Sequence, residues 1–269
     1  MDLTTADFTR LPAETVALLP VAAVEQHGPH LPVGTDTFIN RGIVAETLDI
    51  LGPDGPVLVL PEQAVGTSFE HESYPGTLSH EATRLMGIWT AIFDSVRAAG
   101  VRRALLFNSH GGQAALLQPV ALALRRRGML AAFTSWFWSD LPREHFSEDE
   151  WRFGYHGGAV ETAMMLHLRP DLVVREEVRD FPSSAQAIAA SGEHLAADPG
   201  DGYMAGFGWL SQDLNRFGAM GDARLATAEI GRALVGHAAS RLAGLVGEVS
   251  RLPLTTLETE TFLTGGTDS

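Results

Sequence analysis

Cysteine is absent from the 269-residue sequence. This absence excludes disulfides and thiolate metal sites, and it leaves His, Asp and Glu as the strong ligand types for a metal ion. Basic residues are scarce as well: 19 Lys and Arg stand against 33 Asp and Glu, which gives a formal net charge of −14. Because such a chain does not attract a phosphate backbone, we expect no nucleic-acid partner.

Long apolar runs are also missing. No run is long enough to cross a bilayer, and the first ten residues, MDLTTADFTR, lack the basic and apolar regions of a secretion signal. We therefore expect no membrane partner and a cytoplasmic protein. The remaining composition, with 45% hydrophobic and 19% charged residues, is typical of a globular domain with a sizeable core.

Short apolar runs alternate with amphipathic stretches along the first half of the chain. Thr35 or Asp36, and later Ser79, are candidate helix N-caps, and a glycine follows each predicted helix. We predict strands at 16–24, 56–61, 103–112 and 129–138, and helices at 35–52, 79–100 and 113–128. This order predicts an α/β fold with a mainly parallel sheet and helices on both faces.

The second half of the chain has fewer regular patterns. We predict a helix at 159–168, an irregular region at about 181–221 that could cover a site, and a long helix at 222–252. A loose tail at 252–269 follows. Since no linker or break in composition interrupts the chain, we expect a single domain over 1–269 with its core at about 15–251.

Polar side chains gather where the first predicted strand ends, in the segment VEQHGPHLPVGTD. Glu25 and His27 are two residues apart, so in an extended chain they share one side of the strand end. His30 follows, and the loop can return Asp36 toward the strand. A structural role explains each residue alone, for example Asp36 as a helix N-cap. A buried carboxylate beside an imidazole, however, must be paired or bind a cation.

Two further polar clusters follow later strands. His110 lies in the glycine-rich turn FNSHGGQ, whose backbone N–H groups could also hold a carbonyl oxygen. His156 and Glu161 lie in YHGGAVETAMML, with Glu161 in the first or second turn of a predicted helix. The structural alternatives are a strand-end turn for His110 and a carboxylate favoured at a helix N-terminus for Glu161.

The three clusters can converge in space, because ligands of open α/β sheets bind at the carboxyl ends of the strands. Together the clusters supply imidazole nitrogens and carboxylate oxygens. Two divalent ions that share one carboxylate need such a set of ligands.

Five segments occur in an order and at spacings that resemble the creatininase family: EQHGPHLPVGTD, HESYPGT, NSHGG, HGGAVET and GDARLATAEIG. The resemblance spans about residues 19–231. It implies a three-layer α/β/α sandwich, commonly assembled as a hexamer, with two metal ions for amide hydrolysis. The metal ligands that it implies are Glu25, His27, Asp36, His110 and Glu161, with Asp36 bridging. His156 falls at the position of a catalytic histidine.

The resemblance implies two divalent ions per subunit, Zn²⁺, Mn²⁺ or Fe²⁺, that activate a water and polarise a carbonyl. We assign Glu25, Asp36 and His110 to one ion, and His27, Asp36 and Glu161 to the other. His156 would carry a proton to the leaving nitrogen. Contacts to a small-molecule amide substrate are expected from His71, Gly111, Trp136 and Trp151, although the tryptophans could equally belong to the core or to an interface.

The sequence departs from creatininases in the turn after the third strand. Gly112 stands where creatininases carry an acidic residue, and Gln113 stands where many relatives have Asn. HGG…ETA replaces the usual HAG…ETS. We therefore predict hydrolysis of a small, cyclic or open-chain amide other than creatinine. The alternatives are a peptidase that matures a specific peptide, as for mycofactocin, and a metal-binding member of the family without catalysis.

Overall fold

A parallel sheet forms the centre of the protein. The structure is a computed structural model that describes residues 3–197 and 204–257. Within these residues the sheet has the strand order β2 (Val57–Val59), β1 (Val16–Val21), β3 (Arg103–Asn108) and β4 (Leu130–Ser135). All neighbouring strands in this sheet are parallel, with Val16 of β1 opposite both Val57 and Arg103. The predicted mainly parallel sheet is confirmed, although each strand is shorter than the sequence pattern indicates.

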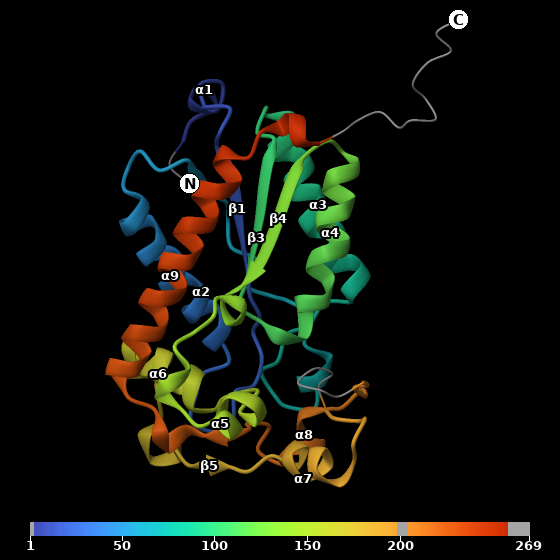
Figure 1. Cartoon of the computed structure of the whole chain (residues 1–269), viewed down its shortest axis with the longest axis vertical. Helices are drawn as coiled ribbons and strands as arrows, with labels where there is room; N and C mark the ends of the chain where they lie inside the picture. Colours follow the sequence, from blue (N-terminus) through green and yellow to red (C-terminus); the bar gives the residue numbers. More distant parts are fainter. Residues whose placement is uncertain (1–2, 198–203, 258–269) are drawn as a thin grey trace, which may run out of the picture.

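Helices cover both faces of the sheet (Figure 1). One face carries α2 (Thr35–Leu51), α6 (Ala159–Leu168) and α9 (Ala228–Arg251), and the other carries α3 (Ala82–Ala98) and α4 (Ala114–Arg126). The predicted three-layer α/β/α sandwich is thus confirmed. From β1 the chain passes outward to β2 and then returns to β3 on the other side, so the order of the strands reverses between β1 and β3.

The two faces of β1 contact different hydrophobic clusters. Val16 and Leu18 pack toward the helices α2, α6 and α9, whereas Ala17 and Leu19 pack toward α3 and α4. Burial on both faces explains why this strand is a continuous apolar run rather than an alternating one. On the first face, α6 and α9 meet at Gly231, where a Cβ atom would lie 1.9 Å from the carbonyl oxygen of Ala163.

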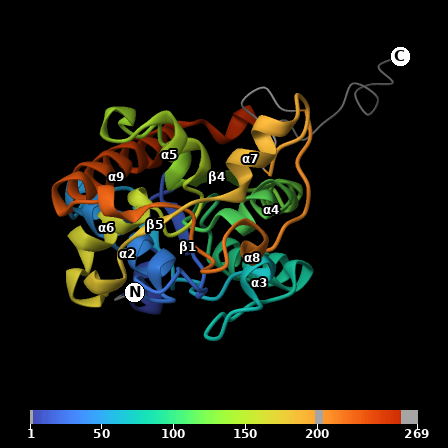
Figure 2. The same ribbon diagram turned by 90° about the horizontal axis from the view of Figure 1, so that it is seen from below.

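Short elements gather beyond the carboxyl ends of the strands (Figures 1 and 2). They are α5 (Glu148–Phe153), α7 (Ser184–Ser191), α8 (Ser211–Leu214) and the antiparallel pair β5 (Asp180–Phe181) and β6 (Gly221–Asp222), while α1 (Thr5–Phe8) precedes β1. The region predicted as irregular at 181–221 therefore contains two short helices. Residues 198–203 of this region, and residues 258–269 of the predicted tail, lie outside the described residues.

The predicted N-caps of two helices and the predicted start of the last helix are wrong. The N-cap of α2 is Gly34, and neither Thr35 nor Asp36 caps the helix. The N-cap of α3 is Glu81, because the hydroxyl of Ser79 accepts a hydrogen bond from the backbone N–H of Ser68 at 3.0 Å instead. The last helix begins after its N-cap Thr227, not at 222.

Among the described residues, no helix combines the length and the apolar character that a membrane span requires.

Candidate metal centre

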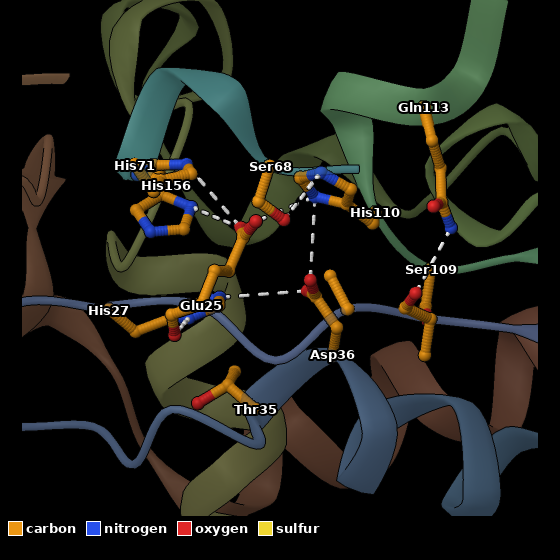
Figure 3. Close-up of polar contacts among 12 residues, drawn as sticks. Glu25, His27, Thr35, Asp36, Ser68, His71, Ser109, His110, Gln113 and His156 are labelled. Carbon is orange, nitrogen blue, oxygen red and sulfur yellow. Dashed lines mark hydrogen bonds and ion pairs between the residues drawn. The ribbon is translucent and has the colours of Figure 1, made fainter. Parts of the chain in front are cut away.

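A cluster of histidines and carboxylates lies where the strand order reverses, beyond the ends of β1 and β3 (Figure 3). The loop after β1, the first turn of α2, the turn after β3 and the start of α6 all reach this point. The structure brings together all five residues predicted as ligands and the predicted catalytic histidine: Glu25, His27, Asp36, His110, Glu161 and His156. The position is the usual ligand site of an open α/β sheet.

Asp36 lies between two histidines and directs one carboxylate oxygen toward each. Its Oδ1 atom is 3.5 Å from Nε2 of His27, and its Oδ2 atom is 3.5 Å from Nδ1 of His110. Glu25 extends the cluster on the side of His110, with Oε1 3.2 Å from the same Nδ1 atom. Glu161 extends it on the other side, with Oε2 3.7 Å from Nε2 of His27.

Several of these polar atoms are buried without a hydrogen-bond partner among the described residues. They are both carboxylate oxygens of Glu25, Oδ2 of Asp36 and Nε2 of His27. Glu25 is 1% exposed and Asp36 is 2% exposed, so water cannot solvate these carboxylates freely. Buried carboxylates in this state need a cation, and the donor set fits a divalent metal ion.

Backbone carbonyls fix which nitrogen of each histidine faces the cluster. Nδ1 of His27 lies 3.0 Å from the carbonyl oxygen of Glu25, and Nε2 of His110 lies 2.8 Å from that of Thr67. A ring N–H donates in both cases, which leaves Nε2 of His27 and Nδ1 of His110 free to bind a metal. Metal-ligating histidines are commonly oriented in this way.

His156 and His71 have a different environment from the other histidines. Nε2 of His156 donates to the carbonyl oxygen of Gln26, so Nδ1 faces Glu25 at 3.5 Å. His71 directs Nε2 toward the same carboxylate at 3.4 Å. The ring of His156 lies between those of His27 and His71, with centroid distances of 4.0 Å and 4.1 Å.

The side chain of Gln26 connects His71 to two loops beside the cluster. Its Oε1 atom accepts from the backbone N–H of Gly28 at 2.9 Å, and its Nε2 atom donates to the carbonyl oxygen of Gly218 at 2.9 Å. The same Nε2 atom lies 2.7 Å from Nδ1 of His71, and the hydroxyl oxygen of Ser211 lies 2.8 Å from that Nδ1 atom. Sequence reasoning missed Gln26.

The carboxylates strongly favour the protonated form of two histidines. Burial alone would lower the pKa of His27, but Asp36 and Glu161 raise it to about 9. Burial also opposes protonation of His110, whose pKa Glu25 and Asp36 nevertheless raise to about 10. Burial raises the pKa of Glu161 to about 7. Divalent cations would replace the protons that His27, His110 and Glu161 bind.

The other two histidines of the cluster stay neutral. Burial lowers the pKa of His156 well below its ordinary range, and the neighbouring His27 and His71 lower it further. Burial likewise lowers the pKa of His71 to about 4. A neutral His156 with its N–H bound to a carbonyl can accept a proton at Nδ1.

A cavity of about 830 Å³ opens onto the cluster. All four residues predicted to contact the substrate line it: His71, Gly111, Trp136 and Trp151. Both indole N–H groups have protein partners, since Trp136 donates to Ser109 at 3.2 Å and Trp151 donates to Arg143 at 2.9 Å. The loop from Phe207 to Trp209 also lines the cavity, so the region at 181–221 does cover the site, as predicted.

Two other residues of the predicted clusters have structural surroundings. His30 is buried, lies 3.0 Å from the hydroxyl of Thr162 and stacks on Phe181. Gln113 donates to Oδ1 of Asn108 at 2.8 Å, at the end of β3.

Glu70 is a further cavity-lining carboxylate that sequence reasoning missed, with Oε1 3.6 Å from Nε2 of His110. Its position beside His71 in the segment FEHESYPGT was the available signal.

The fold and the buried cluster define an α/β/α protein with a candidate metal centre at the strand ends. The family profile described as creatininase, creatinine amidohydrolase, matches residues 1–246. The chain therefore belongs to the creatininase family of hydrolases, and the resemblance seen in its five segments is confirmed.

Individual relatives carry different functions. The chain is 32% identical over 165 residues to a mycofactocin precursor peptide peptidase of Mycolicibacterium smegmatis, a match that covers 61% of this chain and 62%, less than two thirds, of that protein. It is 28% identical over 186 residues to a creatinine amidohydrolase of Pseudomonas putida, which covers 63% and 70% of the two chains. A crystal structure of a creatinine amidohydrolase has the same fold, with a TM-score of 0.75 at 24% identity over 94% of this chain and 97% of that one.

Proposed function

We propose that this chain is a metal-dependent hydrolase that cleaves a C–N amide bond with two divalent ions, Zn²⁺, Mn²⁺ or Fe²⁺. The observation that carries the proposal is a set of buried atoms without hydrogen-bond partners among the residues that the structure describes: three carboxylate oxygens of Glu25 and Asp36 and one imidazole nitrogen of His27. When bound, two such ions polarise a carbonyl group and acidify a water molecule.

In this proposal the ligands fall into two sets, one for each ion, that share Asp36. Glu25 and His110 would hold one ion, and His27 and Glu161 would hold the other. Asp36 would serve both, because its two oxygens face different histidines at 3.5 Å.

His156 would manage the proton of the reaction. Its Nε2–H group is held by the carbonyl oxygen of Gln26, so Nδ1 is the atom that faces the site. We infer that Nδ1 accepts a proton from water and then donates it to the leaving nitrogen. The cavity-lining tryptophans, Trp136 and Trp151, would exclude water from the substrate.

The size of the cavity supports a substrate other than creatinine. Small-molecule sites measure about 300–1,000 Å³, and a cavity of about 830 Å³ is spacious for a single five-membered ring. We therefore propose a larger amide, lactam or formamide.

A peptide substrate is the second candidate, because the same volume admits several residues and a relative with 32% identity is named for a peptide peptidase.

The test combines metal analysis with an assay of substrates. Protein stripped with a chelator and reloaded with Mn²⁺, Zn²⁺ or Fe²⁺ is expected to hold two ions per chain and to cleave cyclic or formylated amides faster than creatinine. Cleavage of short peptides alone would favour the second candidate. A creatinine kcat/KM of ~10⁴ M⁻¹s⁻¹ or more would overturn the substrate proposal, and two bound ions without turnover of any amide would favour a non-catalytic role.

We also propose a homo-oligomer, a hexamer by family resemblance, that acts in the cytoplasm. Light scattering coupled to size-exclusion chromatography would test the assembly.

A further inference from the structure

The space beside Gly112 is filled by a carboxylate from elsewhere in the chain. A Cβ atom at Gly112 would lie 1.9 Å from Oε1 of Glu70 and 2.7 Å from Nε2 of His110. The backbone of Gly112 does not have a positive φ angle, so its conformation does not require glycine. A side chain at position 112 would therefore require the carboxylate of Glu70 to move and would press on His110.

Glu70 belongs to a short 3₁₀ helix, Phe69–His71, and not to the turn that carries His110. The hydroxyl of Ser211 donates to the backbone carbonyl of Glu70 at 2.6 Å, which connects this helix to the first residue of α8. The next residue along the chain, His71, directs Nε2 toward Glu25. The 3₁₀ helix thus presents two consecutive polar side chains to the cluster.

The carboxylate of Glu70 is close enough to the cluster to share an ion with it. Glu25, Glu70 and His110 each offer a ligand atom, and these atoms all lie within 4.8 Å of one another. Independently, both carboxylate oxygens of Glu25 are buried without a hydrogen-bond partner in the described part of the chain, and Glu25 is 1% exposed. The side chain of Glu70 is 19% exposed, on the wall of the cavity.

We propose that Glu70 is an additional ligand of the ion held by Glu25 and His110, and that it replaces the carboxylate missing at position 112. The two positions lie far apart in sequence but compete for the same space. Glu70 can then occupy this position because residue 112 is a glycine. This inference rests on the proposed two-metal function.

The first experiment measures metal binding in Glu70→Gln, which keeps the shape of the side chain and removes its charge. Glu72→Gln, at an exposed position two residues away, is the matched control. Each protein is stripped, reloaded with Mn²⁺ or Zn²⁺, and analysed by mass spectrometry of the metals and by titration against a competing chelator. Circular dichroism of the stripped proteins verifies that both variants are folded.

We expect two ions in the parent and in Glu72→Gln, whereas Glu70→Gln should keep one ion and bind the second at least ~10-fold more weakly, as for loss of a supporting group at a metal site. Two ions bound by Glu70→Gln with the parent's affinity would overturn this inference and leave the proposed function intact. A parent that binds neither ion would overturn the proposed function itself.

A second experiment tests the competition for space. Gly112→Ala adds one methyl group, which would displace the carboxylate of Glu70 and press on His110. Gly112→Ala should therefore lower the metal affinity more when it is made in the parent than when it is made in Glu70→Ala, because the carboxylate of Glu70 is absent from the second background. Equal losses in the two backgrounds would contradict the proposed role of Glu70.

Discussion

Asp36 directs its two carboxylate oxygens toward two different histidines, each at 3.5 Å. Because Gly34 is the N-cap of α2, the start of this helix does not depend on the Asp36 side chain. Asp36→Asn keeps the shape of the side chain and removes the charge that both ions would share. We expect this variant to lose most of its bound metal and its turnover, as measured by metal analysis and an amide assay.

The matched control for this substitution is Asp49→Asn, at an exposed position of the same helix, which should retain both ions. Full turnover with two ions bound to Asp36→Asn would show that Asp36 is not a ligand.

His156 is expected to affect the rate and not the metal content. Its Nδ1 atom faces Glu25 at 3.5 Å, and burial and two neighbouring histidines lower its pKa and keep the ring neutral, so that Nδ1 can accept a proton. His156→Ala should lower kcat by roughly 10²–10⁴-fold while the protein still binds two ions. If one ion were lost instead, His156 would be a ligand, and the proton would have to move through Glu161 or a water.

Part of this site could be predicted because its residues follow recognisable boundaries. Glu25 and His110 lie in the segments that follow the buried strands β1 and β3, and Glu161 lies in the first turn of a helix with a clear start. Glu70 and Gln26 could not be predicted in the same way. Their contacts depend on the path of the loops around them, which no hydrophobic period determines.

Helix α6 agrees residue for residue with its predicted range, and α2 differs only at its final glycine. Each is bounded by a glycine, Gly158 before α6 and Gly52 after α2. The start of α3 was predicted two residues too early, because Ser79 binds the backbone of a distant loop residue, Ser68. Local sequence cannot distinguish such a tertiary hydrogen bond from a helix cap.

Arg103, at the start of β3, connects the sheet to the C-terminal end of α9. It is buried and donates to the carbonyl oxygens of Val249 at 3.1 Å, Ser250 at 3.0 Å and Leu252 at 2.9 Å. These are carbonyl groups that the last turn of a helix leaves without partners. Arg103→Met should lower the free energy of unfolding by ~3 kcal/mol or more, because several buried acceptors lose their donor.

Urea unfolding followed by circular dichroism would measure this change. Arg102→Met is the control, since Arg102 is exposed and donates to a single residue, Gly128. Equal stability of the two variants would contradict a special role for Arg103 at the end of α9.

At the scale of the whole molecule, the proposed metal binding would compete with protonation of the cluster. In the metal-free protein the carboxylates raise the pKa of His27 to about 9 and that of His110 to about 10, against their own burial. Since these values lie above the unfolded value of about 6.5, the stabilisation from the protonated histidines is complete below that pH and is lost as the pH rises through 9 and 10. Metal binding must displace the same protons.

The rise in melting temperature on adding metal should therefore grow from about pH 6 to about pH 8. Differential scanning fluorimetry of stripped and reloaded protein would measure this rise. The melting temperature of Asp36→Asn should change little on adding metal at any pH. A shift that shrinks with rising pH would contradict protonated histidines in the metal-free state.

The reversal of strand order between β1 and β3 also has a consequence for the way the chain folds. The cluster joins residues from Glu25 to Glu161, and the contacts of His27 with Glu161 and of Glu25 with His110 each close a long loop. Loop closure of this length is entropically unfavourable until the surrounding elements are in place. The ligand set becomes complete only after β1 and β3 have paired and α6 has packed on the sheet. Metal binding would then be a late step in folding, which follows the formation of the sheet and does not nucleate it.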